Sequence, residues 1–496
     1  MSRLPLLAAS LVVCTLAAPS PARAQHADAG LAGLLANLIL RDIVTPSNEG
    51  GAPGSVLPHD AHFSPFNRQY LGLLSARQGL PEIATVAAFN RALATELATF
   101  PLGSSSGGFV YTFEPSTGAF SRESSSFGPA FAERSRTIGA RRMNLGFSYR
   151  YSSYDTFEGR GLRDNHINFY LPHNDCCPGQ TSDGSAVGDG KLGPDPAAVA
   201  FEGDLVRVSL DMRARTDTAA FFFAYGLTNR WDIGVAIPLV RVDLDATANA
   251  EMLRLSTADR PLIHSFQVGH PEATTARVNA AGSAAGLGDI LLRSKCNLAQ
   301  AGPTGLAATL DLRLPTGNED DLLGAGAFQA KVALVASTGW DRFAQHFGVG
   351  YTFSGKGHLE PLLGDGTAFV ADAFGSGARA VNDEFNVVAG VEWAAHPRLT
   401  IVGDLLGRTL RDAGRLSLVT KSFPYVLQGQ SGPTRTAQFD EFSWRGGNLN
   451  LLTSTVGFKA NVKDYLLLSG HVLVPLTDAG LRDRIALVVG MDFSLP

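Results

Sequence analysis

Apolar and polar residues alternate with a period of two over most of the chain after about residue 137. The segments 205–214, 306–314 and 485–493 show the pattern clearly, with an apolar residue at every second position. Such alternation predicts β-strands with one apolar face. The strands are longer than those of soluble sheets, whose mean is about five or six residues. They suit a tilted membrane strand, which needs about nine to eleven. The pattern therefore favours a membrane barrel over a soluble sandwich.

The connections between the predicted strands alternate in length. The strands are predicted at 137–152, 204–226, 230–245, 284–298, 304–314, 327–338, 342–354, 384–395, 398–410, 449–461, 465–476 and 484–494. Short joins such as Thr228-Asn229 and His396-Pro397 separate the longer ones. The longest joins, expected outside the cell, are 153–203, 246–283, 355–383 and 411–448. Long outer loops, short inner turns and an even strand number are typical of outer-membrane barrels. We predict an all-β membrane protein, a 12-stranded antiparallel outer-membrane β-barrel with both termini periplasmic; the alternative is 14 strands.

The alternation also assigns the two faces of the barrel wall. Leu306 and Leu310 are expected to face lipid. The charged residues at alternate positions are expected to line the lumen, because Arg or Lys facing mid-bilayer lipid costs about 2–4 kcal/mol. These lumen candidates are Arg207, Asp211, Arg213, Arg293, Lys295, Asp311 and Arg313. Pairing across neighbouring strands would make most of them fillers and braces of a polar lumen.

The N-terminus has the features of a secretory signal. Arg3 supplies a positive charge, the stretch from Leu4 to Ala18 is apolar, and Ala22-Arg23-Ala24 forms a cleavage site. Residues 1–24 are therefore interpreted as a cleaved signal peptide. Export places the mature chain, by this interpretation, in the cell outer membrane.

Residues 25–136 differ from the alternating region at 137–496, which we assign to the barrel. Leucines recur at helical spacing between residues 31 and 38, and apolar residues do so within 82–99. A short hairpin is expected just after these segments. The chain before the barrel is therefore predicted to be a partly helical N-terminal extension.

The extension offers candidates for a hatch. Its apolar helix face needs a surface to bury against. Loops and helices that are not lipid-exposed can fill a barrel lumen. We expect part of 81–136 to pack into or under the barrel, with the aromatic residues Phe109, Tyr111 and Phe113 lining a path for apolar solutes.

Composition restricts the partners. The net charge of −5 and the pI of about 6.1 provide no electrostatic footprint for nucleic acid. Charged residues make up 18% and the mean hydropathy is +0.06, which suits alternating strands better than membrane helices. The expected partners are outer-membrane lipid, small apolar or aromatic solutes and the outer-membrane assembly machinery. Phe493 lies near the C-terminus and is expected to serve as the aromatic signal for that machinery.

No metal, cofactor or catalytic group is predicted. Cys176 and Cys177 are adjacent, which does not fit the C-x₂₋₄-C spacing of zinc sites, and their state stays open. Ser105 lies in a G-x-S-x-G match, but the predicted helix precedes it and the strand follows, the reverse of a nucleophile elbow. Ser469 and His471 share one face of a strand without an identifiable orienting acid.

Several short motifs carry a resemblance to a known family. They are the runs Phe100–Phe109, Phe127–Arg134, Tyr225–Pro238, Gly286–Ile290 and Arg313–Gly317. As a set they resemble the bacterial outer-membrane barrels labelled as transporters of the phenol meta-cleavage pathway. The resemblance covers most of the mature chain. It implies a barrel that passes small hydrophobic or aromatic molecules.

Three classes of function follow from these patterns. The leading interpretation is an outer-membrane channel or transporter for small hydrophobic or aromatic molecules. A structural or surface-binding barrel without transport is the first alternative, since long loops are natural sites for partners. An outer-membrane hydrolase is the second alternative, weakened by the missing catalytic set.

Overall fold

The computed structural model describes most of the barrel and parts of the N-terminal extension. The described residues are 30–35, 38, 93, 96–97, 103, 111–114, 119–122, 126–172, 203–258, 264–266, 270–357, 379–427, 434–463 and 465–495. Within this part of the chain no helix is long and apolar enough to cross a membrane.

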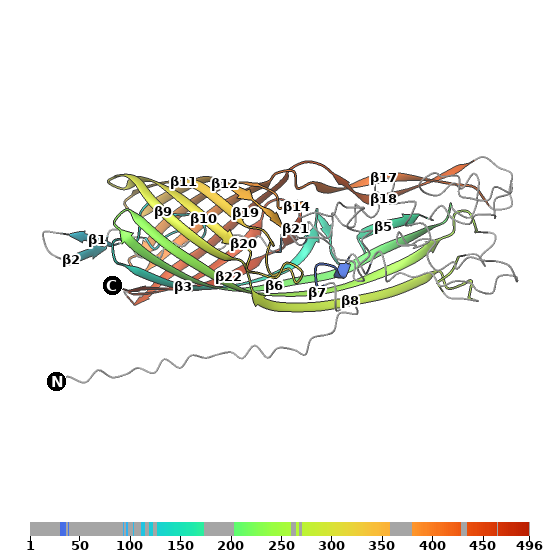
Figure 1. Ribbon diagram of the computed structural model, residues 1–496, viewed down its shortest axis with the longest axis horizontal. Helices are drawn as coiled ribbons and strands as arrows, with labels where there is room; N and C mark the ends of the chain where they lie inside the picture. Colours follow the sequence, from blue (N-terminus) through green and yellow to red (C-terminus); the bar gives the residue numbers. More distant parts are fainter. Residues whose placement is uncertain are drawn as a thin grey trace, which may run out of the picture.

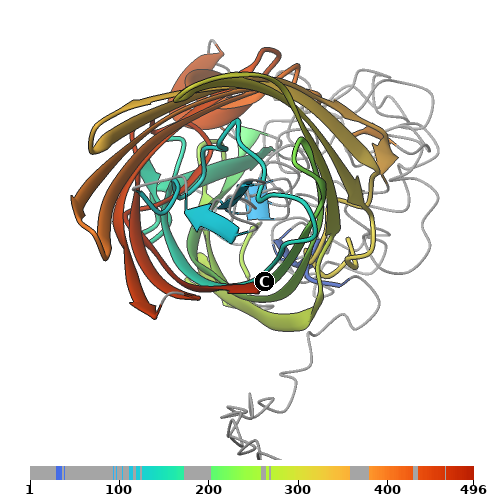
Figure 2. The same ribbon diagram turned by 90° about the vertical axis from the view of Figure 1, so that its left-hand side faces the viewer.

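Twelve antiparallel strands close into a barrel (Figures 1 and 2). In chain order they are β3 (Met143–Phe157), β6 (Leu205–Thr228), β7 (Trp231–Leu253), β9 (Ile290–Ala301), β10 (Thr304–Leu314), β11 (Gln329–Trp340), β12 (Phe343–Ser354), β15 (Glu384–His396), β16 (Leu399–Leu410), β19 (Leu449–Lys463), β20 (Leu466–Pro475) and β22 (Ala486–Leu495). Each strand pairs with the next, and β22 returns to β3, so the wall has no open seam. The predicted strand number of twelve is confirmed.

All five predicted short turns lie at one end of the barrel. They join β6 to β7, β9 to β10, β11 to β12, β15 to β16 and β19 to β20. The start of β3 and the end of β22 lie at the same end, because Met143 pairs with Leu495. Short turns mark the periplasmic side of outer-membrane barrels, so we take this end as periplasmic.

The long connections contain more strand than the sequence predicted. They hold β4 (Arg160–Gly161), β5 (Ile167–Pro172), β8 (Thr275–Leu287), β13 (Lys356–Gly357), β14 (Arg379–Ala380), β17 (Arg415–Tyr425), β18 (Arg435–Arg445) and β21 (Leu481–Asp483). The predicted loops 246–283 and 411–448 are therefore wrong in large part: β7 and β8 pair through the first, and β17 and β18 form a hairpin in the second. The alternation there is carried by small residues, such as the alanines of β7, and gives a weak signal.

The outer face of the barrel is apolar around the membrane-spanning strands. Leu306 and Leu310 are about 40% exposed on this face, at 39% and 40%, as the alternation predicted. Near the periplasmic turns Trp340, Phe343 and Trp393 stack in a row, with ring centroids 6.2 Å apart at each step. Aromatic girdles of this kind lie at the membrane interfaces of outer-membrane barrels.

Strands β6 and β7 extend beyond the ends of the other strands, away from the periplasmic turns. Along them the apolar face changes from the outside of the wall to the inside. Even-numbered residues face inward along the whole of β6: Ala220 lines the lumen below, and Leu210 above is fully buried. On the outer face of β7, Leu239 is exposed and apolar, whereas Arg241, the next outward residue, pairs with Asp243. The wall thus leaves the membrane between Leu239 and Arg241. We call the part above this level the extracellular extension.

Three of the residues that were predicted to line the lumen lie elsewhere, in the extracellular extension. Arg207, Asp211 and Arg213 do not face the lumen; they lie on the outer face of the extension, where Arg207 pairs with Glu251 of the neighbouring strand. The inward positions of this stretch are taken by a fully buried apolar set: Val206, Val208, Leu210 and Met212. Above the membrane the outside is water, so charged residues face out and apolar residues face in.

The interior of the extracellular extension is an apolar core, and leucines of the N-terminal segment belong to it. Leu35, Leu38 and Leu93 are buried in the same cluster as Leu210 and Leu244. Leu34, Leu35, Leu38, Leu93, Glu96 and Leu97 are helical, in agreement with the predicted helices. These leucines are therefore buried against the inside of the extracellular extension.

The predicted hairpin is present as β1 (Tyr111–Glu114) and β2 (Ala119–Arg122). Figure 1 shows it beyond the periplasmic end of the barrel, and Figure 2 shows it in front of the opening. Tyr111 and Phe113 lie on β1, whereas Phe109 lies outside the described residues. The signal peptide, Ser105 and the pair Cys176 and Cys177 also lie outside them.

Candidate functional site: the plugged lumen

Residues 126–138, just before the first barrel strand, lie inside the periplasmic part of the barrel; we call them the plug. Phe127, Ala132 and Ser135 are almost completely buried. The plug has no regular secondary structure, so its backbone groups need partners from the wall. The strands supply these partners from inward-facing polar side chains.

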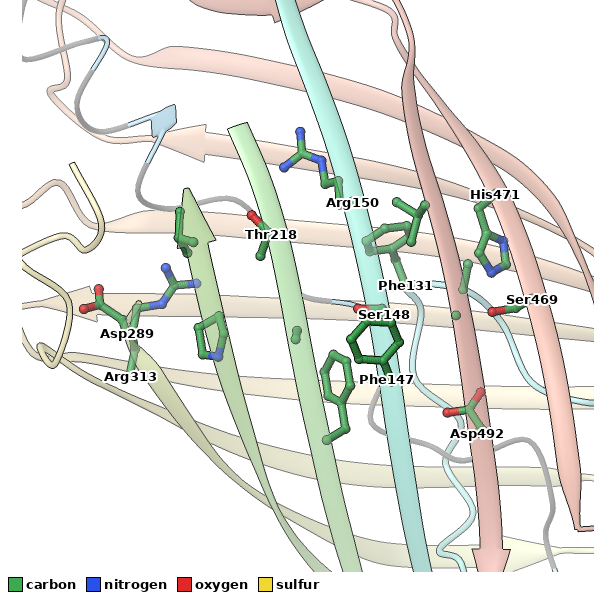
Figure 3. A pocket seen from close by; sticks show the side chains of 18 of the residues that line it. Phe131, Phe147, Ser148, Arg150, Thr218, Asp289, Arg313, Ser469, His471 and Asp492 are labelled. Atoms are coloured by element: carbon green, nitrogen blue, oxygen red, sulfur yellow. The ribbon is translucent and has the colours of Figure 1, made fainter. Parts of the chain in front are cut away.

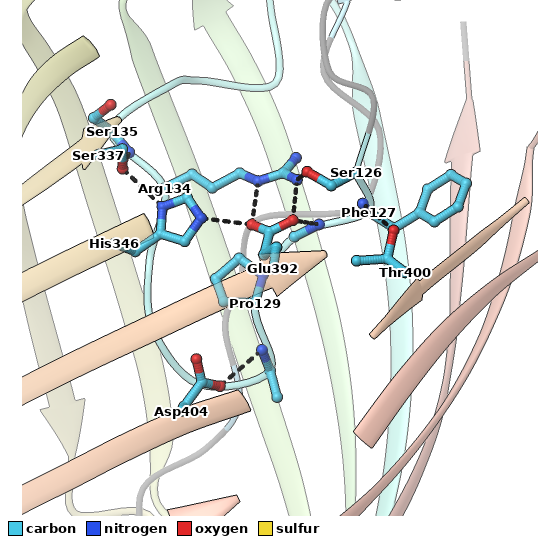
Figure 4. A network of polar contacts seen from close by, with 12 residues as sticks. Ser126, Phe127, Pro129, Arg134, Ser135, Ser337, His346, Glu392, Thr400 and Asp404 are labelled. Atoms are coloured by element: carbon cyan, nitrogen blue, oxygen red, sulfur yellow. Dashed lines mark hydrogen bonds and ion pairs between the residues drawn. The ribbon is translucent and has the colours of Figure 1, made fainter. Parts of the chain in front are cut away.

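Glu392 on β15 is the centre of the contact (Figure 4). Its carboxylate accepts two hydrogen bonds from Arg134, from Nε at 3.1 Å and Nη2 at 2.7 Å, and one from the Gly128 N–H at 2.9 Å. Nε2 of His346 lies 2.6 Å from the same carboxylate, and Nδ1 lies 2.9 Å from the Ser337 hydroxyl. Glu392 is fully buried, so its charge depends on these donors.

The neighbouring strands hold the backbone of the plug. Asp404 on β16 accepts from the N–H groups of Ala130 and Phe131, at 2.9 and 2.8 Å. The Thr400 hydroxyl accepts from the Phe127 N–H at 3.1 Å. From β19, Nζ of Lys459 donates to the Pro129 carbonyl at 2.8 Å. These bonds reach the residues 127–131, which belong to one of the family-like motifs.

The opposite wall anchors the other end of the plug. Glu133 pairs with Arg293 and lies 3.6 Å from Lys295. The Ser135 N–H donates to the Ser337 hydroxyl at 2.8 Å. The Ile138 N–H donates to Asp232 at 3.0 Å, where β7 leaves its turn. The plug is therefore held from both sides of the lumen.

The family-like motifs meet in space. The motif at 225–238 supplies Asn229 and Asp232, which bind the end of the plug. The motifs 286–290 and 313–317 contact each other: Thr316 donates to the Gly288 carbonyl at 2.7 Å, and the Gly317 N–H donates to Asp289 at 3.1 Å. Gly288 is needed at this bend, since a Cβ there would lie 2.9 Å from a Val240 methyl group.

The remaining predicted lumen residues face inward. Arg293, Lys295 and Asp311 are buried in ion pairs, and Arg313 lines the lumen beside Asp289 (Figure 3). Sequence reasoning missed His346, Glu392 and Asp404. Their signal was an isolated charged or imidazole side chain at an inward position between apolar outward neighbours, as in Val391-Glu392-Trp393.

A cavity of about 100 Å³ lies in the lumen beside the plug. We call it the aromatic cavity. Two phenylalanine rings face it, Phe131 from the plug and Phe222 from β6, whereas the Phe147 ring packs on Phe221 at the outer face of the wall, with ring centroids 5.2 Å apart. Polar side chains also line it: Ser148, Arg150, Thr218, Asp289, Arg313, Ser469, His471 and Asp492 (Figure 3), together with Lys459. A concave site that combines aromatic rings with polar side chains can hold a small molecule through both.

Glu96 connects the N-terminal extension to the upper lumen. Its carboxylate accepts from the Leu481 N–H at 2.7 Å and pairs with Arg482 at 3.1 Å. Burial raises the pKa of Glu96 from its ordinary 4.5 to about 7, although Arg482 opposes the shift. Docking of this segment is therefore coupled to proton uptake.

The residues considered for hydrolysis do not assemble a catalytic set among the described residues. Ser469 and His471 both line the aromatic cavity, but Nδ1 of His471 makes no hydrogen bond within the described part of the chain. His346 does lie between Ser337 and Glu392. However, the Ser337 hydroxyl already accepts the Ser135 N–H of the plug. This triad-like array holds the plug in place.

These features define a plugged outer-membrane β-barrel. Residues 197–394 match the family described as putative MetA-pathway of phenol degradation. The match begins just before β6 and ends in β15, and it includes three of the motifs that carried the resemblance. The family resemblance seen in the sequence is confirmed over this segment. No curated protein matches the chain.

Several solved structures show some likeness to the chain. An outer membrane channel from Pseudomonas putida F1 shares 12% identity, with 73% of this chain and 97% of that chain covered and a TM-score of 0.38. The CymD monoaromatic hydrocarbon channel shares 8%, with 72% and 89% covered and a TM-score of 0.32. A Pseudomonas aeruginosa FadL homologue shares 10%, with 71% and 89% covered and a TM-score of 0.28. Scores this low add nothing to the strand pairing of the chain itself.

Proposed function

We propose that this protein is a channel that passes small hydrophobic or aromatic molecules across the outer membrane. The aromatic cavity carries the proposal: it places the rings of Phe131 and Phe222 together inside an otherwise charged lumen. The two rings give an apolar solute a contact that excludes water, and the polar side chains around them can fix its orientation. The segment that matches the phenol-degradation family, 197–394, contributes Phe222, Pro238 and Arg313 to the cavity.

The plug acts in this proposal as the gate. It is held by hydrogen bonds and ion pairs, beside two small apolar contacts, of Phe127 with Leu467 and of Phe131 with the cluster around Val488. Polar contacts of this kind can exchange for water when the segment moves. Its Phe131 belongs to both the plug and the cavity, so a solute that enters the cavity touches the gate directly.

The N-terminal features stay within the proposal. A cleaved signal peptide at 1–24 would export the chain, 25–136 would supply the plug and the helices, and 137–496 would form the barrel. The hairpin with Tyr111 and Phe113 would then lie on the periplasmic side of the path. Phe493 would present the aromatic signal to the assembly machinery.

A filled cavity tests the function. Ala220 lines the aromatic cavity, and Ala219 is the adjacent outward residue on the same strand. Initial uptake of radiolabelled benzyl alcohol is measured in intact cells that express the wild-type chain, Ala220→Trp or Ala219→Trp. Heat-dependent gel mobility confirms that each barrel is folded.

We expect Ala220→Trp to lower uptake to the level of cells without the protein, because the indole fills the cavity. Ala219→Trp should match the wild type, because it adds an aromatic group on the lipid side. Equal uptake through a folded Ala220→Trp barrel would show that solutes do not use this cavity.

A further inference from the structure

A second cavity lies in the lumen and differs in chemistry from the aromatic cavity. Its volume is about 140 Å³, and we call it the charged cavity. Its lining contains the cations Arg293, Arg313, Lys331 and Arg408 and the carboxylates Glu133, Asp311 and Glu384. Four cations against three carboxylates leave one positive charge in excess.

The charges stand in register across neighbouring strands. Arg293 of β9 pairs with Asp311 of β10, and Asp311 stands opposite Lys331 of β11. Arg313 stands opposite Gln329, so Lys331 is the diagonal neighbour of Arg313 on the same inward face. Diagonal neighbours lie about 7–8 Å apart at their Cα atoms, which is within reach of long side chains.

Most of the charges are already paired. Asp311 accepts two hydrogen bonds from Arg293, at 2.6 and 2.7 Å, and Arg293 also pairs with Glu133. Glu384 accepts two from Arg408, at 2.9 and 2.6 Å. Lys331 differs: within the described residues its ammonium makes no hydrogen bond or ion pair, although it lines the cavity. An ammonium without a partner in a partly enclosed lumen is costly unless an anion joins it.

The two cavities meet. Phe131 and Arg313 line both of them. Phe222 lines only the aromatic cavity and Lys331 only the charged cavity, so Phe131 and Arg313 mark the junction between them. A ligand that bridges this junction has an aromatic body and a compact negative group.

We propose that the lumen recognises small aromatic carboxylates, with the ring beside Phe131 and the carboxylate between Arg313 and Lys331. The inference rests on the proposed function, because it names the solute class of the same lumen. Arg313 provides a planar donor and Lys331 a point charge, and charge-assisted hydrogen bonds to a carboxylate are the stronger kind. The rings of the aromatic cavity can contact an aromatic hydrocarbon as well as an aromatic acid. The Lys331 ammonium of the charged cavity favours the acid, because it can bind the carboxylate.

Binding of matched probes tests the proposal. Benzoate, benzyl alcohol and acetate are titrated calorimetrically into the purified full chain in detergent. Benzyl alcohol has the ring without the charge, and acetate has the charge without a ring. We expect benzoate to bind about tenfold or more tightly than either, since an ionic hydrogen bond contributes more than the step of about 1.4 kcal/mol that tenfold requires.

Variants locate the charge. Lys331→Gln should weaken benzoate binding about tenfold, Lys331→Arg should keep it, and Lys463→Gln, which removes an exposed cation near Tyr465, should leave it unchanged. Benzyl alcohol uptake by intact cells should not change in Lys463→Gln. If benzoate binds no more tightly than benzyl alcohol, or binds equally well to Lys331→Gln, the proposal that the lumen recognises aromatic carboxylates is wrong. The proposed channel for apolar molecules is unaffected by that result. Loss of benzyl alcohol uptake from the wild-type chain would instead remove the proposed function.

Discussion

The membrane half and the extracellular extension of this barrel share strands but not chemistry. Along β6 and β7 the even-numbered residues face inward from end to end. Below the level of Leu239 the outside is apolar and the inside is polar and filled by the plug; above it the outside carries Arg241 and Asp243 and the inside is an apolar core. The strand geometry is constant, so the surrounding solvent alone sets which face is apolar.

The two halves also fill their interiors differently. The lower lumen is filled by a segment held through Glu392 and Asp404, that is, by polar contacts. The upper interior is filled by leucines of the N-terminal extension packed against Leu210 and Leu244. Polar packing can open and be wetted, whereas apolar packing excludes water. We therefore expect the gate in the lower half and a stable lid in the upper half.

The largest effect is expected from Glu392→Gln. The change leaves Arg134 without its buried ionic partner, and breaking such a pair costs about 3–5 kcal/mol. Planar-bilayer recordings should show a several-fold increase in ion conductance as the plug leaves its site. Glu272→Gln, an exposed extracellular carboxylate, is the control and should behave as the wild type. Wild-type conductance in a folded Glu392→Gln barrel would mean that Glu392 does not hold the plug.

Leu244→Ala tests the upper interior. Leu244 is 1% exposed in the apolar core of the extension, and Leu→Ala in a core costs about 2–5 kcal/mol. We expect faster protease cleavage of the extracellular loops in intact cells, with unchanged conductance through the plugged lower lumen. Asp245→Ala, the adjacent outward position, should leave cleavage unchanged. A conductance increase in Leu244→Ala alone would place the gate in the upper half.

Outer-face substitutions on β7 test the level of the membrane. Ile237 and Thr247 both face outward, below and above Leu239. Ile237→Arg should reduce the amount of folded barrel, because an arginine facing lipid costs up to about 2–4 kcal/mol at the midplane. Thr247→Arg should fold normally, because its surroundings are aqueous. Quantifying the heat-modifiable band in outer membranes distinguishes them, and equal yields would remove the inferred boundary.

The smallest effect is expected from pH. The pKa of Glu96, about 7 when docked against 4.5 ordinarily, means that the docked segment binds more protons than the free segment. The stabilisation is therefore complete below about pH 4.5 and declines as the pH rises through 7. Protease protection of the N-terminal extension should be modestly greater at pH 5 than at pH 8. Glu96→Gln should remove the difference; a pH dependence that persists in this variant would assign it to another group.

The sequence predicted the barrel well because closure and alternation are strong constraints. Each strand pairs with both neighbours, and its outer face contacts lipid. The leucines of β10 therefore had to lie on the outer face. The same alternation does not reveal whether the outer face of a strand end contacts lipid or water. Arg207 and Arg213 were therefore placed in the lumen, although the wall there stands in water.

The site was harder to predict than the fold. The family-like motif at 127–134 pointed to a special segment, but its partners Glu392, His346 and Asp404 lie more than 200 residues away on other strands. Only strand register brings them together. Isolated polar residues on inward positions were the available signal, and their spacing along the chain does not reveal that they converge.

Conductance of a chain without its plug tests the central claim most directly. Residues 126–135 are replaced by a glycine-serine linker of equal length, and the folded barrel is recorded in planar bilayers beside the wild-type chain. If the plug closes the lower lumen, the variant conducts ions at a level several-fold above the wild type and loses its selectivity for aromatic solutes in cell uptake. A folded variant with wild-type conductance and wild-type uptake would contradict the account.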